Sequence, residues 1–113
     1  MKSCNNCDLL KNISKTKNGS VSYCEKSGQF HIEMVSMLIF LSRKEFEYFC
    51  SFLEFLDIEN ENQYIHLPSG KIIIQPAINS SLYVFLPDEL KELKVLLKYA
   101  NKQLKIEKQM AHF

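Results

Sequence analysis

The fold of this chain is decided by residues 23–46, YCEKSGQFHIEMVSMLIFLSRKEF, and by a shorter echo at residues 64–75, YIHLPSGKIIIQ. Each stretch holds a Ser-Gly pair, Ser27-Gly28 or Ser69-Gly70, between runs that contain apolar residues. Glycine tolerates the positive φ that tight hairpin turns need, so each stretch predicts an antiparallel hairpin. The strands predicted in this way cover residues 21–25, 29–34, 64–67 and 71–75.

Each hairpin is followed by a third apolar run and then by a helix start. The runs at residues 36–41 and 82–86 predict short strands. Ser42-Arg43-Lys44-Glu45 matches a capping box, and Pro87-Asp88-Glu89 suits the first turn of a helix because proline lacks an N–H and acidic residues favour the positive end of the helix dipole. The predicted helices cover residues 43–57 and 87–109.

The recurring order predicts an α+β fold built from an internally duplicated β-β-β-α unit. The simplest arrangement is an antiparallel sheet of up to six strands with two helices packed on one face. A unit of about forty residues buries little apolar surface alone, so the two halves should share one core. The alternative is a coincidental similarity between two ordinary hairpins. The predicted organisation is a polar N-terminal arm over residues 1–20 and a single domain over 21–110, with repeats at about 21–57 and 64–109.

Bulk composition supports one folded unit without a dominant charge. The 113 residues are 46% hydrophobic and 12% aromatic, which is ample for a core. With 14 basic and 13 acidic residues the formal charge is +1, so no overall field recruits nucleic acid or an anionic membrane. The first 20 residues hold no apolar stretch long enough for a signal peptide or a membrane span, and we expect a cytoplasmic protein.

Four cysteines in a reducing compartment favour thiols or metal ligands, although an even count leaves a disulfide open. Cys4 and Cys7 have the spacing of a metal knuckle. If Ser27 and Gly28 form a two-residue turn, Cys24 lies directly opposite His31 on the face away from the core. These four residues would complete a structural Cys₃His zinc site that pins the arm to the hairpin.

Two other interpretations of the same residues stay open. Cys24 to Gly28 also aligns with the second knuckle of a zinc ribbon, in which Ser27 stands where a cysteine is expected. In the other interpretation, Cys24 is simply a small strand residue and no metal is bound. The second hairpin, in which His66 is expected to face Ile73, is predicted to form without a metal. Four protein ligands would leave no open position, so a catalytic metal is disfavoured.

No catalytic constellation is evident. Cys50 falls on the apolar face of the first helix and is predicted to be a core residue. Neither His66 nor His112, which lies near the terminus, suggests a catalytic triad, and three glycines provide no phosphate-binding loop. A nucleophilic Cys24 thiolate activated by His31 is a remaining alternative. We therefore expect a protein that is not an enzyme and infer no small-molecule substrate.

The helices carry more apolar surface than one small domain needs. On the first helix, Tyr48, Phe52 and Phe55 widen the core face, an excess that either packs on the second helix or stays exposed. The second helix carries two opposed apolar stripes, which predicts a homodimer or a protein partner. The alternative is that long side chains cover scattered apolar surface. The stripe expected to face the core comprises Leu90, Leu93, Leu97, Ala100 and Leu104, and the predicted dimer interface comprises Val95, Tyr99, Ile106 and Met110.

Between these stripes, lysines fall along one edge of the second helix. Such a ladder is a candidate anion-contacting surface and would suit phosphates. A solvated face is the plainer interpretation, because no aromatic residues interleave with the lysines. The ladder comprises Lys91, Lys94, Lys98, Lys105 and Lys108, with Lys102 nearby.

The hairpin with Cys24 and Ser27-Gly28, the triplet Phe30-His31-Ile32, the apolar strand, and Ser42-x-x-Glu45-Phe46 together resemble a family of short uncharacterised bacterial proteins. Members of that family have a Cys-x-x-Cys hairpin, an apolar-His pair, a strand and a helix that opens with Ser or Thr and contains Glu-Phe. Ser27 departs from the second cysteine of that pattern. The resemblance implies no known activity.

These observations favour a small interaction or regulatory module, dimeric and stabilised by a structural zinc. The alternative is a nucleic-acid-associated protein that uses the cysteine-containing arm and the lysine ladder.

Overall fold

The computed structural model describes residues 10–60, 64–76 and 82–110, with the side chains of residues 108–110 excluded. Along the chain the elements are β1 (Leu10–Lys15), β2 (Ser20–Cys24), β3 (Gln29–Met34), β4 (Met37–Ser42), α1 (Arg43–Phe55), β5 (Ile65–His66), β6 (Ile72–Ile74), β7 (Tyr83–Phe85) and α2 (Pro87–Met110). The predicted strands and helices are all present, with ends that differ by at most two residues.

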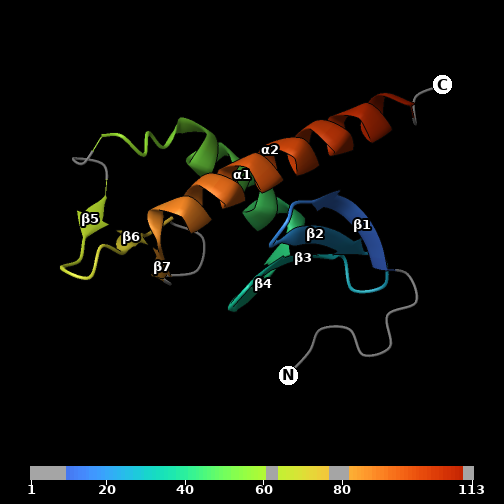
Figure 1. Ribbon diagram of the computed structural model, residues 1–113. Coiled ribbons are helices and arrows are strands. Elements are labelled where there is room, and N and C mark those ends of the chain that lie inside the picture. The colour runs from blue at the N-terminus through green and yellow to red at the C-terminus, as the bar shows by residue number, and fades with distance from the viewer. Residues whose placement is uncertain (1–9, 61–63, 77–81, 111–113) are drawn as a thin grey trace.

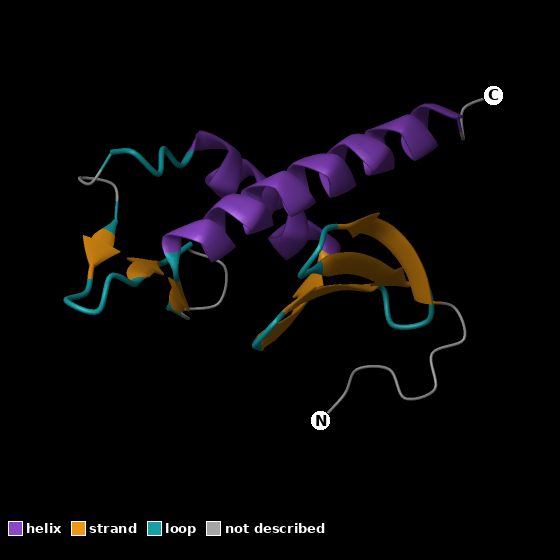
Figure 2. Ribbon diagram, viewed as in Figure 1, coloured by secondary structure: helices purple, strands orange, loops and turns teal. Residues whose placement is uncertain are grey.

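The α+β class is confirmed, but the strands form two antiparallel sheets instead of one. Figure 2 shows β1-β2-β3-β4 as one sheet and β5-β6-β7 as a second, smaller one. The strands of the second sheet are two or three residues long and, among the described residues, pair only with one another. The internal duplication is not confirmed, because the first sheet has four strands and the second has three.

The strand that the sequence did not predict is β1, which lies in the second half of the expected polar arm. It pairs with β2 along its length, with a register irregularity between Asn12 and Ser14. Its hydroxyl and charged groups bind α2: Ser14 Oγ donates to the Leu96 carbonyl at 2.9 Å, and Lys11 pairs with Glu107 at 3.0 Å. These polar contacts let a segment with few apolar residues join the sheet.

Both helices cover one face of the four-stranded sheet, as predicted. α1 packs on β3 and β4, whereas α2 packs on β1 and β2 and also reaches β7 (Figure 1). The rings of Phe30 in β3 and Phe46 in α1 stack with centroids 4.1 Å apart. One core cluster therefore joins the first sheet, both helices and the second sheet through Ile72, Ile74 and Phe85.

The start of each helix is determined by local sequence. The Ser42 hydroxyl accepts from the Glu45 N–H at 3.2 Å, and the Glu45 carboxylate accepts from the Ser42 N–H at 2.8 Å, which confirms the predicted capping box. At α2, the Glu89 carboxylate accepts from the Leu86 N–H at 2.8 Å and Pro87 begins the helix. In both places an unpaired backbone N–H at a helix start is satisfied.

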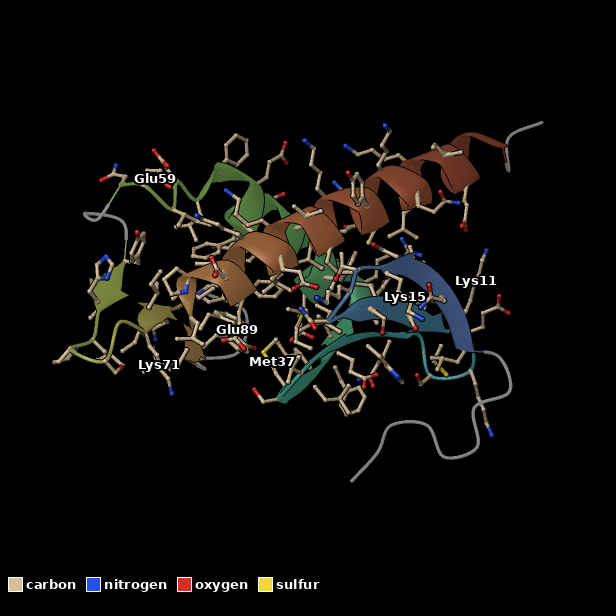
Figure 3. All side chains as sticks on the ribbon, viewed as in Figure 1. Lys11, Lys15, Met37, Glu59, Lys71 and Glu89 are labelled. Carbon is tan, nitrogen blue, oxygen red and sulfur yellow. The ribbon has the colours of Figure 1, made fainter. Side chains whose placement is uncertain are left out.

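The two sheets meet near the start of α2. Figure 3 shows Met37 of β4 and Glu89 of α2 at this junction, where both line a cavity of about 230 Å³. In the described parts of the chain, neither helix is both long and apolar enough to span a bilayer.

Candidate functional site

Cys24 and His31 lie on one face of the first sheet but are not directly opposite each other, which corrects the predicted register. Cys24 pairs with Gln29, and His31 pairs with Ser22. The turn is longer than two residues, because Gly28 has a φ of 73° and its N–H donates to the Cys24 carbonyl at 2.8 Å. Cys24 and His31 are therefore diagonal neighbours on the face away from the helices.

The second hairpin differs from its predicted register in a similar way. His66 pairs with Ile72, and Ile65 pairs with Ile73. Gly70 has a φ of 91°, and its N–H donates to the Leu67 carbonyl at 2.9 Å. The expected pairing of His66 with Ile73 is therefore wrong by one residue.

The Cys24 sulfur is not a thiolate in this structure. Cys24 has no exposed surface and is disulfide-bonded. Cys4 and Cys7, the other predicted cysteine ligands, lie outside the described residues. Over residues 10–60, 64–76 and 82–107, no three His, Cys, Asp or Glu side chains gather in a way that could hold a metal ion. Both hypotheses that use the Cys24 thiolate, as a zinc ligand or as a nucleophile, therefore require the reduced protein.

The His31 imidazole sits in a shallow cavity on the same face of the sheet. Its ring stands edge-on to Phe40 with centroids 4.6 Å apart, and its buried Nε2 has no hydrogen-bond partner among the described residues. Burial lowers the pKa of His31, which favours the neutral imidazole. The cavity has a volume of about 250 Å³ and is lined by Leu10, Ser20, Ser22, His31, Glu33, Leu38 and Phe40.

The lysine ladder of α2 forms one wall of a groove against α1. Lys94, Lys98 and Lys105 of the predicted ladder line this groove, whereas Lys91 is exposed outside it. The side chain of Lys108 lies outside the described residues. The Lys94 ammonium donates to the carbonyl of Leu56, the C-cap residue of α1. A cation at a helix C-terminus satisfies a free carbonyl and favours the dipole, so Lys94 has a structural role.

The groove between α1 and α2 has a volume of about 500 Å³. Its walls combine aliphatic surface with charged groups from both helices. The residues that line it are Cys50, Glu54, Lys94, Val95, Leu97, Lys98, Asn101, Lys102 and Lys105.

Cys50 forms part of the core side of the groove, and its prediction as a core residue is confirmed. Its side chain is 6% exposed, and its thiol donates to the Leu97 carbonyl at 3.9 Å. Burial raises the pKa of Cys50 to about 12, with Glu47 and Glu54 acting in the same direction and Lys105 opposing them. The thiol is therefore protonated at neutral pH and is a poor nucleophile.

The outer face of α2 carries the predicted second apolar stripe. Val95, Tyr99 and Ile106 are 44%, 56% and 41% exposed, whereas Leu93 and Leu97 on the opposite side are buried. The side chain of Met110 lies outside the described residues. On α1, Phe55 is 79% exposed, so the excess apolar surface of that helix is only partly covered.

The sequence missed two features that need two distant elements. The groove forms only because α1 packs on α2, and the spacing of the lysines on α2 was the one feature of the sequence that pointed to it. The second feature is a polar clamp on Glu92, whose carboxylate accepts from Thr16 Oγ1 at 2.5 Å and from the Asn18 N–H at 2.8 Å. Hydrogen bonds from Thr16 and then Asn18 lower the pKa of Glu92. The Thr16 and Asn18 partners lie in a segment that the sequence left without structure.

The family model that matches this chain is described as Family of unknown function (DUF6686), and it matches residues 6–111. No curated protein and no solved structure matches the chain.

Proposed function

The chain belongs to this family of unknown function, and we propose that it is a small, non-catalytic interaction module that works as a homodimer joined through the outer face of α2. The match agrees with the resemblance to a family of uncharacterised proteins, although it does not test the motif that carried the resemblance. The observation that carries the proposal is an apolar face on α2 that the described residues leave exposed.

The outer face of α2 has the composition of an interface core. Val95, Tyr99 and Ile106 are each more than two-fifths exposed, and they lie on the side of the helix opposite the buried leucines. A large exposed apolar patch on a protein surface marks an interaction site. Tyrosine is also enriched at interfaces because it combines a large apolar ring with a hydroxyl.

The charges on this face favour an antiparallel pair of helices. Asp88 near the start of α2 and Lys102 near its end fall on the same side by helical periodicity. In an antiparallel arrangement Asp88 of one copy approaches Lys102 of the other, whereas a parallel arrangement places like charges together. Opposite charges at an interface rim support the correct orientation and disfavour the wrong one.

The test is the molecular mass in solution of the double variant Val95→Glu/Tyr99→Glu, measured by sedimentation equilibrium against the unmodified chain. We expect a dimer for the unmodified protein and a folded monomer for the variant, because two carboxylates would have to be buried in the interface. The control is Val35→Glu, at an apolar residue that is 75% exposed in the turn between β3 and β4, which should remain a dimer. A monomer for the unmodified chain would refute the proposal.

A structural zinc in the reduced protein is a second proposal, supported by the buried Nε2 of His31, which has no hydrogen-bond partner in the part of the chain that the structure describes. With the disulfide reduced, Cys24 and His31 would supply two ligands from one face of the sheet, and Cys4 and Cys7 the other two. Metal content of protein purified with a reducing agent tests it: one zinc per chain, lost in both Cys24→Ser and His31→Ala, is expected. Zinc-free reduced protein would refute it.

Nucleic-acid association is the alternative function, and the lysine ladder of α2 is the observation that favours it. Salt-dependent binding of random single-stranded oligonucleotides would support this alternative over the interaction module.

A further inference from the structure

We propose that the groove between α1 and α2 is a binding site for a small amphiphilic anion, a molecule with an apolar chain that ends in a carboxylate. The proposal goes beyond a homodimer, because the site is complete within one chain. It rests on the charge of the groove, on its apolar lining and on its size.

The lining of the groove has an excess of positive charge. Lys98, Lys102 and Lys105 face it from α2, and Glu54 is the acidic residue among those that line it. In the described part of the chain, no ion pair involves any of these three lysines. Lys94 differs, because its ammonium is already bound to the C-cap carbonyl of α1. Three ammonium groups without acidic partners around one groove are complementary to an anion.

Apart from Asn101, the rest of the lining is apolar. Val95 and Leu97 contribute aliphatic surface from α2, and the protonated thiol of Cys50 contributes no charge from α1. Lysine side chains also present their methylene stems to a groove while their ammonium groups stay in water. An apolar interior with cationic ends on its walls suits a ligand that has both characters.

The size of the groove favours a small molecule over a macromolecule. Its volume of about 500 Å³ lies within the usual range of small-molecule sites, roughly 300–1,000 Å³. A nucleic-acid strand would need a longer cationic track with aromatic platforms for its bases. No aromatic residue lines this groove.

Variants separate this site from the proposed dimer face. Val95 and Lys102 are used in both surfaces, so the variants avoid them. Tyr99 belongs to the outer stripe but does not line the groove, whereas Lys98 and Lys105 line the groove. Tyr99→Glu therefore tests the dimer alone, while Lys98→Gln and Lys105→Gln test the groove with the methylene stems kept. Lys91→Gln is the matched control, since Lys91 lies on the same helix but outside the groove.

The experiment is calorimetric titration with sodium decanoate below its micelle-forming concentration, with decanol and decyltrimethylammonium as neutral and cationic probes of the same chain length. We expect saturable binding of one decanoate per chain, weaker binding of decanol and no binding of the cation. Lys98→Gln and Lys105→Gln should each weaken decanoate binding about tenfold, the loss expected for one charge-assisted contact. Lys91→Gln should bind as the unmodified protein does.

Amide chemical shifts locate the bound probe. Decanoate should shift the amides of Cys50, Leu97 and Asn101 in the unmodified protein and in Tyr99→Glu. Absence of saturable decanoate binding would overturn the proposal, as would equal weakening in Lys91→Gln. Binding of a single-stranded oligonucleotide at these amides without decanoate binding would also overturn it and assign the groove to nucleic acid.

Discussion

The hairpin around Ser27-Gly28 and the hairpin around Ser69-Gly70 have similar turns but lie in sheets of different size. Gly28 and Gly70 both adopt positive φ, at 73° and 91°. The strands after the turns also match in their first core residue: Phe30 and Ile72 each stand two positions beyond the glycine, and they are 0% and 1% exposed. The strands of the first hairpin are five and six residues long, whereas those of the second are two and three.

The difference between the hairpins arises from their neighbours. The first hairpin has β1 on one side, β4 on the other and two helices across one face. The second has only β7 beside it, and Ile65 in its outer strand is 61% exposed. Local sequence thus determines the turn and the first core residue after it, while the neighbouring elements determine how long the paired strands are.

The largest expected effect comes from truncating the two matched core residues. Phe30→Ala should lower the free energy of unfolding by about 3–5 kcal/mol, because it removes a fully buried ring that stacks on Phe46. Ile72→Ala should cost about 2–4 kcal/mol, since the smaller side chain leaves a smaller cavity. Urea unfolding of both variants measures the difference. A larger loss for Ile72→Ala would show that the second sheet contributes more to stability than the first.

The next effect concerns Gly19, in the turn between β1 and β2, which lies close to β3 and α2. A Cβ on Gly19 would lie 2.5 Å from Met34 Sδ, 3.0 Å from the Glu33 carbonyl and 3.2 Å from Leu96 Cδ2. Gly19→Ala should therefore lower the free energy of unfolding by about 1–3 kcal/mol through overpacking. In a Met34→Ala background, which has its own cavity cost, the further loss caused by Gly19→Ala should be smaller, because the space beside Gly19 is then vacant. Wild-type stability of Gly19→Ala would contradict the close approach.

The two turn glycines should respond alike. Gly28→Ala and Gly70→Ala should each cost about 1 kcal/mol, because L-residues rarely adopt positive φ. No atom lies within 4 Å of a Cβ added at either position, so strain of the backbone is the expected cause. Thermal unfolding of both variants provides the comparison. Unequal losses of stability in the two variants would show that the two turns themselves differ in backbone strain.

The smallest expected effect is on stability in acid, and it concerns the contact between Glu92 of α2 and the turn that joins β1 and β2. Hydrogen bonds from Thr16 and Asn18 hold the pKa of Glu92 below its ordinary value of 4.5. A lowered carboxyl pKa adds stability that is present above about pH 4.5 and is lost as the pH falls through the lower folded-state value.

Glu92→Gln should make the unfolding temperature less sensitive to acid between pH 5 and pH 3, in a range set roughly by the ordinary carboxyl pKa. Glu25→Gln is the control, because Glu25 is exposed in the turn between β2 and β3 and the change leaves the Thr16 and Asn18 contacts intact. An unchanged acid profile for Glu92→Gln would show that the clamp adds little to stability.

Most of the local structure could be predicted from the sequence. The capping box at Ser42 and Glu45 placed the start of α1, and Pro87 placed the start of α2. The glycines placed both turns, although the register was wrong because an i+4 backbone hydrogen bond at Gly28 lengthened the first turn. Such a bond depends on the exact backbone path, which residue types alone do not specify.

The elements that could not be predicted are those whose partners are distant in sequence. β1 has too few apolar residues to be recognised as a strand, and its contacts with Leu96 and Glu107 are 82 and 96 residues away. The lysine ladder was evident on α2, but its role in a groove appears only when α1 lies beside it.

The sequence by itself determined the α+β class, the helix starts, the turn glycines and the two-sided character of α2, because each follows from short-range sterics, capping or periodicity. Tertiary structure alone decided that the strands divide into two sheets, that a polar segment joins the first sheet, and that lysines and Cys50 share one groove. These outcomes depend on which surfaces meet across long stretches of chain, where packing and polar pairing outweigh local preference.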